Sequence, residues 1–141
     1  MVDVMPELHA LIVEDELLIG LGLQTQLAEL GFESFAFAGT ARQALEQARL
    51  HCPDLVALDM GLLDGDGVEA AEAIRAACGP LAVIYITGDS AAAAARRPGA
   101  VILDKPVTTA ALSGALLRAR AQIAVLARSP AERHGTVTAP R

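Results

Sequence analysis

Residues Pro53–Asp59 read PDLVALD, with four apolar residues in succession between two aspartates. Such a run, without polar alternation, is typical of a strand in a parallel sheet that is covered on both faces. Pro53 fits at the start of the strand, because it has no N–H to donate to the ladder. The strand ends at Asp59, and ligands of open parallel sheets bind outside the carboxyl ends of the strands. Asp59 is therefore a candidate site residue.

Strands and helices alternate on both sides of this segment. The other apolar segments predict strands at Leu8–Val13, Phe32–Phe37, Leu81–Ile86 and Ala100–Leu103. Helices are predicted at Glu16–Leu30, Thr40–Leu50, Val68–Ala77 and Ser90–Arg97, with a last one starting at Thr108 or Thr109. Five such alternations predict an α/β fold with a doubly wound, five-stranded parallel sheet.

The apolar faces and ends of these helices follow from spacing and capping residues. The first helix is expected to turn a leucine stripe inward, made of Leu18, Leu21, Leu23, Leu27 and Leu30. Thr40 and Asp66 are expected to cap the second and third helices. Residues 1–127 form one predicted domain, and residues 128–141, which lose the periodicity, are expected to be a disordered tail.

Composition excludes several classes of protein. The 141-residue chain is 53% hydrophobic but only 3% aromatic, which predicts an aliphatic core. Its net charge of −6 argues against a nucleic-acid partner, since phosphate binding needs a basic patch. Met1–Glu7 lacks the pattern of a signal peptide. Val107–Ala127 is interrupted by Arg118, Arg120 and Gln122, so we expect an amphipathic helix and no membrane partner.

The chain has two cysteines, Cys52 and Cys78, without a CxxC motif or a histidine pair nearby. We expect two free thiols in a reducing cytoplasm rather than a disulfide or a metal site.

Polar residues interrupt the apolar pattern where the strands end. They are Glu14, Asp15, Asp59, Thr87 and Lys105. In a parallel sheet these ends meet at one edge, and carboxylates so close together repel one another unless a cation lies between them. Oxygen ligands favour Mg²⁺, Lys105 offers a charge for a phosphate, and a carboxylate such as Asp59 can attack phosphorus. Phosphoryl transfer needs little beyond alignment and charge neutralisation.

This series of residues resembles the receiver domain of two-component response regulators over about residues 7–127. The resemblance rests on Glu14-Asp15, Asp59, Thr87 and Lys105-Pro106, in this order on successive strand ends. It implies a flavodoxin-like, CheY-like (βα)5 sandwich. It also implies that Asp15, Asp59 and the backbone carbonyl of Gly61 hold Mg²⁺, with Glu14 acting partly through water.

The resemblance also implies how the phosphoryl group is handled. Asp59 would accept it from the phosphohistidine of a sensor histidine kinase or a phosphotransfer protein. Thr87 and Lys105 would bind its oxygens, and the bond before Pro106 would be cis. The chain would be a stand-alone switch for an unidentified protein effector. It would not be an enzyme beyond accepting and losing its own phosphoryl group.

Some positions depart from the usual receiver pattern. Leu63 stands where the family often has proline, and Ile102 stands where it usually has the switch tyrosine or phenylalanine. Tyr85 lies two residues before Thr87, on the same strand face, where it is a candidate switch residue, although core packing is the more frequent role of an aromatic ring. The run at residues 85–88 resembles the Phe-Ala-Thr-Gly run of a divergent single-domain subgroup. The alanine-rich helix after it is expected to be mobile without phosphate.

Two other motifs in the chain would indicate different functions. Asp64–Val68 matches the Asp-x-Asp-Gly pattern of haloacid-dehalogenase-like phosphohydrolases, but that pattern must directly follow a buried strand. Gly20-Leu21-Gly22 resembles a dinucleotide-binding fingerprint, but it lies inside a helix and lacks the third glycine. A pseudo-receiver that only binds a partner, and a phosphohydrolase that turns over a phosphate ester, remain the alternatives.

Overall fold

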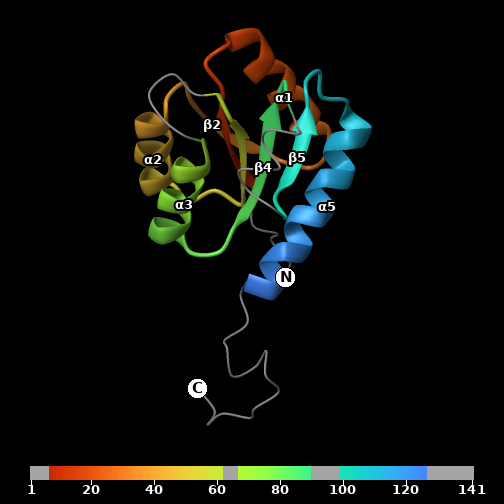
Figure 1. Cartoon of the computed structure of the whole chain (residues 1–141). Helices are drawn as coiled ribbons and strands as arrows, with labels where there is room; N and C mark the ends of the chain where they lie inside the picture. The colour runs from red at the N-terminus through yellow and green to blue at the C-terminus, as the bar shows by residue number, and fades with distance from the viewer. Residues whose placement is uncertain (1–6, 62–66, 90–98, 127–141) are drawn as a thin grey trace, which may run out of the picture.

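A computed structural model describes residues 7–61, 67–89 and 99–126, and in these ranges it contains five strands and four helices (Figure 1). The strands are β1 (His9–Val13), β2 (Ser34–Ala38), β3 (Leu55–Asp59), β4 (Ala82–Thr87) and β5 (Val101–Asp104). The helices are α1 (Leu17–Glu29), α2 (Ala41–Leu50), α3 (Gly67–Cys78) and α5 (Thr109–Leu126). The predicted helix at Ser90–Arg97 and the predicted tail at residues 128–141 lie outside the described ranges.

The five strands form one parallel sheet in the order β2-β1-β3-β4-β5. The predicted fold class is confirmed, and β3 is the central strand of the sheet. Residues Leu55–Leu58 are completely buried, as expected for a strand covered on both faces. Most of the other strands begin and end one or two residues later than the sequence pattern predicted, and the sites at their ends are not displaced by this.

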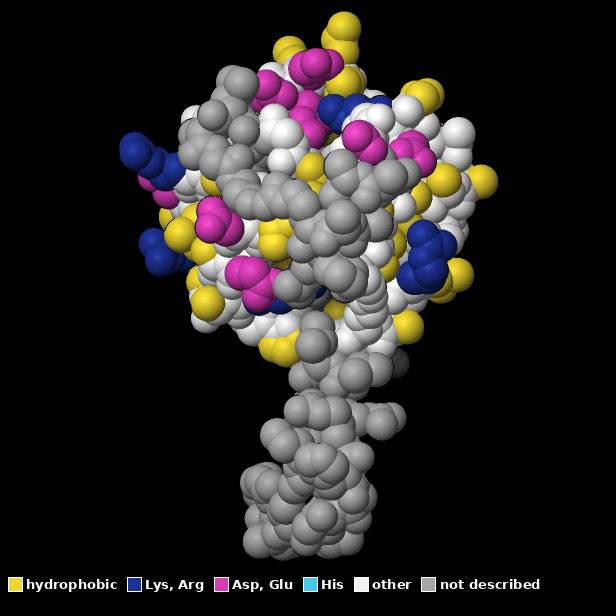
Figure 2. Space-filling view, in the orientation of Figure 1, with side chains coloured by type: hydrophobic (Ala, Val, Ile, Leu, Met, Phe, Trp, Pro, Cys, Tyr) yellow, Lys and Arg dark blue, Asp and Glu magenta, His cyan; other side chains and the backbone are white. Residues whose placement is uncertain are grey.

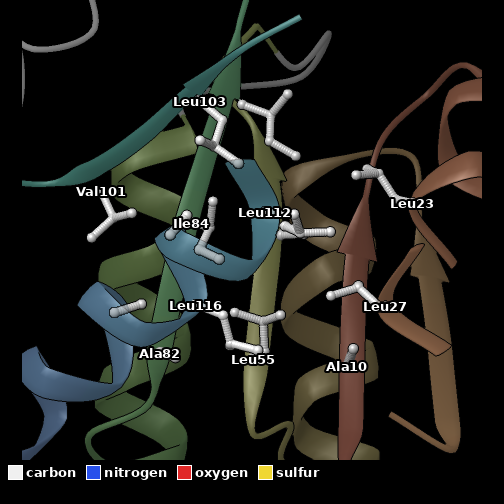
Figure 3. Packing of buried hydrophobic residues seen from close by; sticks show 14 of the residues in the cluster. Ala10, Leu23, Leu27, Leu55, Ala82, Ile84, Val101, Leu103, Leu112 and Leu116 are labelled. Atoms are coloured by element: carbon white, nitrogen blue, oxygen red, sulfur yellow. The ribbon is translucent and has the colours of Figure 1, made fainter. Parts of the chain in front are cut away.

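Helices cover both faces of the sheet. On one face, α1 and α5 pack on an aliphatic cluster that includes Leu27, Ile84 and Leu112 (Figure 3). On the other face, α2 and α3 pack on a second cluster that includes Leu58 and Ile74. Leu55 and Ala57 lie in the first cluster and Val56 and Leu58 in the second, so a shift of β3 by one residue would exchange side chains of different size between two filled layers.

The leucine stripe predicted for α1 is only partly correct. Leu23 and Leu27 are buried, but Leu18 is 83% exposed and Leu21 is 43% exposed. A helix advances about 100° per residue, so the face that carries Leu23 and Leu27 turns Leu18 away from the sheet. The first seven positions of α1, Leu17–Leu23, carry no polar side chain, so the pattern alone could not show which face would be covered.

Two of the helix starts are set by threonine side chains. Thr40 Oγ1 accepts a hydrogen bond from the backbone N–H of Gln43 at 3.1 Å, as the prediction for α2 requires. Thr108 Oγ1 accepts one from the N–H of Ala111 at 3.1 Å at the start of α5. Asp66, the predicted cap of α3, lies outside the described ranges. After α3, Gly79 has φ +86°, a conformation that few residues other than glycine adopt.

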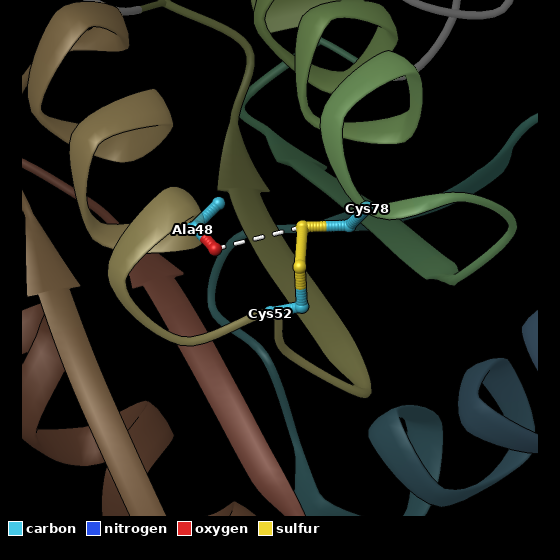
Figure 4. Close-up of a disulfide and its surroundings, with 3 residues drawn as sticks. All are labelled: Ala48, Cys52 and Cys78. Carbon is cyan, nitrogen blue, oxygen red and sulfur yellow. Dashed lines mark hydrogen bonds between the residues drawn. A yellow bond between two sulfur atoms is a disulfide. The ribbon is translucent and has the colours of Figure 1, made fainter.

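The expectation of two free thiols is wrong, because Cys52 and Cys78 form a disulfide (Figure 4). Cys52 follows the end of α2, and Cys78 is the last residue of α3. These two helices pack side by side on the same face of the sheet, which brings the two Cα atoms to 5.7 Å. The pairing depends on contacts between segments 26 residues apart in sequence, which no local motif could reveal.

Candidate functional site

The carboxyl ends of β1, β3, β4 and β5 bring the predicted site residues to one edge of the sheet. Glu14 and Asp15 follow β1, Asp59 ends β3, Thr87 ends β4, and Lys105 follows β5. Figure 2 shows Asp and Glu side chains gathered at the upper end of the view, next to a Lys or Arg side chain. The sheet order places β3 between β1 and β4, so Asp59 lies in the middle of this edge.

Asp59 is held in place by its neighbours on both sides. It is 8% exposed, and its Oδ1 accepts a hydrogen bond from the Gly61 N–H at 3.0 Å. Its Oδ2 lies 3.5 Å from Lys105 Nζ. The N–H of Met60 donates to the Ile86 carbonyl at 3.0 Å, which extends the ladder between β3 and β4 beyond Asp59. The carboxylate is therefore positioned by strand geometry, a turn and an ion pair together.

Three carboxylates form a group that fits a divalent cation. Glu14, Asp15 and Asp59 each offer an oxygen, and these atoms lie within 4.8 Å of one another. An all-oxygen set of this size suits Mg²⁺, which keeps several waters when it binds. Gly61 adjoins the group, because its N–H is bound to Asp59 and its carbonyl belongs to the same turn.

Lys105 supplies the positive charge of the site. Its Nζ lies 3.4 Å from Glu14 Oε1 and 3.5 Å from Asp59 Oδ2. Burial lowers the pKa of Lys105, but the carboxylates of Asp59 and Glu14 outweigh burial and raise it above its usual value. Burial raises the pKa of Glu14, and the Asp59 carboxylate adds to that rise, whereas the Glu16 N–H and Lys105 oppose it. Because its pKa is raised, the Lys105 ammonium group is fully charged near neutral pH.

Thr87 and Lys105 are joined through the backbone. The Lys105 N–H donates to the Thr87 carbonyl at 2.9 Å, which places both side chains at adjacent strand ends. Thr87 Oγ1 accepts a hydrogen bond from the Asp89 N–H at 3.0 Å. The Lys105–Pro106 peptide bond is cis, in agreement with the resemblance.

Tyr85 and Ile102 are directly opposite each other on β4 and β5. Tyr85 is 1% exposed and lies in the cluster beneath α2 and α3, with Ile102 partly buried against the same cluster. Tyr85 is therefore a core residue, as its position in the strand suggested. A role for either side chain in switching stays a prediction.

A groove beside the acid group was missed by the sequence reasoning. It has a volume of about 740 Å³, and it lies between α1 and the segment after β5, with Ile19, Leu23 and Lys105–Val107 among its lining residues.

Leu17 and Leu18 are exposed on α1 near its start, at 70% and 83%. Such exposed leucines could have been found from the run Leu17–Leu23, which has more apolar side chains than one helix face can bury.

The two competing motifs lie at positions that do not suit the chemistry they would indicate. Gly20 and Gly22 lie within α1, and Gly20 is buried where the helix meets Phe37 and Ile12. Residues 64–66 of the dehalogenase-like pattern lie outside the described ranges. Its last two residues, Gly67 and Val68, begin α3, and β3 ends at Asp59, five residues before the pattern starts.

Comparisons with known proteins show the family of the chain. The model of the response regulator receiver domain matches residues 10–117, so the chain belongs to the receiver domain family of two-component response regulators.

The chain is similar to a curated relative over about half of its length and to solved structures over most of it. The transcriptional regulatory protein PdtaR of Mycobacterium tuberculosis is 44% identical over 66 residues, which are 47% of this chain and 32% of PdtaR. The structure of a sensor protein from Polaromonas sp. JS666 is 29% identical, with a TM-score of 0.72, over 84% of this chain and 99% of that one. A response regulator receiver protein from Sinorhizobium medicae WSM419 is 26% identical, with a TM-score of 0.70, over 83% and 94%.

The chain thus spans about a third of the length of the curated relative PdtaR. In the part of the chain that the structure describes, no helix is long and apolar enough to cross a bilayer.

Proposed function

We propose that this chain is a phosphorylation switch that accepts a phosphoryl group on Asp59 in a Mg²⁺-dependent reaction. The observation that carries this proposal is the position of Asp59. It is a nearly buried carboxylate at the end of the central strand, with two further carboxylates and the Lys105 ammonium group around it. A structural ion pair would need one carboxylate for one ammonium, whereas three carboxylates leave negative charge for a divalent cation to neutralise.

The chain's own residues supply positioning and charge. In the transfer, an Asp59 oxygen bonds to phosphorus as the bond from phosphorus to the donor's histidine nitrogen breaks, which leaves an acyl phosphate and a free imidazole. The Gly61 N–H holds Oδ1, so the carboxylate does not rotate freely. Lys105 loses little by leaving its carboxylate partners for phosphoryl oxygens, because it remains paired with negative charge.

Mg²⁺, when bound by Glu14, Asp15, Asp59 and the Gly61 carbonyl, would neutralise charge on the phosphoryl oxygens. Thr87 would donate its hydroxyl hydrogen to one of these oxygens, while its Oγ1 still accepts from the Asp89 N–H. In this proposal the chain is not an enzyme for a separate substrate. It only accepts the phosphoryl group and loses it by hydrolysis.

The donor in this proposal is a sensor histidine kinase or a phosphotransfer protein in the cytoplasm. Leu17 and Leu18 are exposed at the start of α1, which begins two residues after Asp15 in the chain. An apolar partner surface would cover these leucines while it delivers the phosphoryl group. The stand-alone arrangement and the effector remain predictions, and the mass of the native protein in a cell extract would test the first.

The test is phosphorylation by acetyl phosphate, with and without Mg²⁺, followed by intact mass. The chain should gain one phosphoryl group only with Mg²⁺, and Asp59→Asn should gain none. Asp104→Asn is the matched control, because Asp104 is an exposed acid at the same edge and lies outside the carboxylate group. Its phosphorylation should equal that of the parent chain.

Two results would reject the proposal. If the parent chain binds Mg²⁺ but never gains the phosphoryl group, it is a pseudo-receiver that only binds a partner. If it releases many equivalents of phosphate from a small phosphate ester without stable labelling of Asp59, it is a phosphohydrolase.

A further inference from the structure

The Cys52–Cys78 disulfide lies at the amino ends of the strands, opposite the edge that carries Asp59. It joins the segment after α2 to the last residue of α3 (Figure 4). Cys52 is exposed to solvent, whereas Cys78 is half-buried. The two sulfurs are therefore unequal in access, and a small thiol in solution meets Cys52 first.

The backbone around Cys52 is held by contacts that do not need the disulfide. The neighbouring His51 ring stacks on the buried His9 ring, with centroids 3.7 Å apart and planes at 7°. Asp54 is fixed on both sides, because its N–H donates to the His9 carbonyl at 2.8 Å and its Oδ2 accepts from the His9 N–H at 2.8 Å. Pro53, which lies between Cys52 and Asp54 in the chain, is buried. Reduction of the bond should leave Cys52 close to its present position.

Cys78 is held equally well on its side. It ends α3, whose Ile74 is fully buried, and the Gly79 N–H donates to the Arg75 carbonyl at 2.7 Å. Its Sγ lies 3.5 Å from the Ala48 carbonyl oxygen on α2, the contact drawn in Figure 4. A disulfide sulfur carries no hydrogen, so this contact becomes a hydrogen bond only when Cys78 is a thiol. The site thus has a satisfied reduced state as well as an oxidised one.

We propose that Cys52–Cys78 is a reversible thiol–disulfide exchange site, with Cys52 as the sulfur that a low-molecular-weight thiol attacks. The thiolate of the reductant bonds to Cys52 Sγ, and the bond to Cys78 breaks. Cys78 leaves as a thiolate, takes a proton from water, and as a thiol donates a hydrogen bond to the Ala48 carbonyl. A second thiolate then attacks the reductant's sulfur in the mixed disulfide and releases Cys52. Two reductant thiols are oxidised to one disulfide, and the protein gains two thiols.

This site is separate from the proposed phosphorylation. The exchange closes or opens a loop of 26 residues that contains the whole of β3 and Asp59, yet the bond itself lies at the far end of that strand. The proposed function places the chain in the cytoplasm, and on that proposal a reversible bond is expected, because a permanent one would be unusual in a reducing compartment.

The experiment uses the full chain, purified without reductant and titrated with mixtures of reduced and oxidised glutathione. Free thiols are alkylated and located by peptide mass spectrometry, and far-ultraviolet circular dichroism follows the fold. The oxidised chain should show no alkylated cysteine, and the reduced chain should show two with an unchanged spectrum. Limiting glutathione followed by rapid alkylation should trap glutathione on Cys52 and the alkyl group on Cys78 of the same chain.

Two variants give a matched comparison. With oxidised glutathione, Cys78→Ser should become glutathionylated on Cys52, and Cys52→Ser should react on the order of tenfold more slowly at the half-buried Cys78. Equal rates in the two variants would overturn the proposal, as would glutathione trapped on Cys78 of the parent chain. It would also fail if both cysteines of the unreduced chain were alkylated, or if the bond yielded only in denaturant. None of these outcomes decides the proposed function, which labelling of Asp59 by acetyl phosphate tests separately.

Discussion

Replacing Gly67 with alanine would test how closely the start of α3 packs against the carboxyl end of β3. A Cβ at this position would lie 3.1 Å from the Asp59 carbonyl oxygen, 3.1 Å from Met60 Cα and 3.2 Å from Leu58 Cδ2. The first two are backbone atoms, and the Met60 N–H is bound to the β4 backbone. Leu58 is completely buried. None of the three neighbours can move aside without disturbing the sheet.

The magnitude follows from two opposing effects. Alanine is a better helix former than glycine by up to about 1 kcal/mol, and less in the first turn. Overpacking of a filled interior costs about 1–3 kcal/mol. We therefore expect Gly67→Ala to lower the free energy of unfolding by about 1–2 kcal/mol.

Gly22→Ala is the matched control, because Gly22 is an exposed glycine inside α1 and an added Cβ meets nothing within 4 Å. This variant should raise the free energy of unfolding by about 0.5–1 kcal/mol. Urea unfolding of both variants, followed by circular dichroism, should give shifts of the midpoint in opposite directions at an unchanged slope. A Gly67→Ala protein as stable as the parent chain would refute the close packing described here.

Three further predictions concern the disulfide, the buried histidine and the lysine of the site. Cys78→Ser should lower the free energy of unfolding by about 3.5 kcal/mol, from the 26-residue loop that the bond closes, and should match the fully reduced parent chain; equal stability to the oxidised chain would contradict this. Burial, with the neighbouring imidazole second, lowers the pKa of His9, so the unfolded chain binds the proton more readily. Stability should therefore fall as the pH drops below about 6.5, and urea midpoints of His9→Gln should show a smaller fall over the same range. Lys105→Met should tighten Mg²⁺ binding about fivefold in calorimetry, because a partly exposed cation no longer competes for Glu14 and Asp59, and it should also reduce phosphorylation by acetyl phosphate. Unchanged Mg²⁺ affinity would mean that the ion pairs do not oppose the metal.

Some features could be predicted because they depend on neighbours in sequence. The apolar run at Leu55–Leu58 predicted a buried strand, and Thr40 predicted a helix start, since strand and cap geometry involve residues a few positions apart. The gathering of Asp59 and Lys105 also followed from the sequence, because strands joined by helices run parallel and end at the same edge.

Other features could not be predicted because they depend on how distant segments pack. The exposure of Leu18 depends on which side of α1 meets the sheet, and the start of the helix, which has no polar side chain from Leu17 to Leu23, does not specify that side. The groove beside Lys105 depends on the distance between α1 and the segment after β5.

The sequence by itself determined the order of strands and helices and the polar residues at the strand ends, because both follow from local periodicity and chain direction. Only the tertiary structure decided that Cys52 and Cys78 would be joined and that Tyr85 would lie opposite Ile102. Those pairings result from the packing of α2 against α3 and from the register of β4 against β5. Burial of apolar surface by segments far apart in the chain sets both of them.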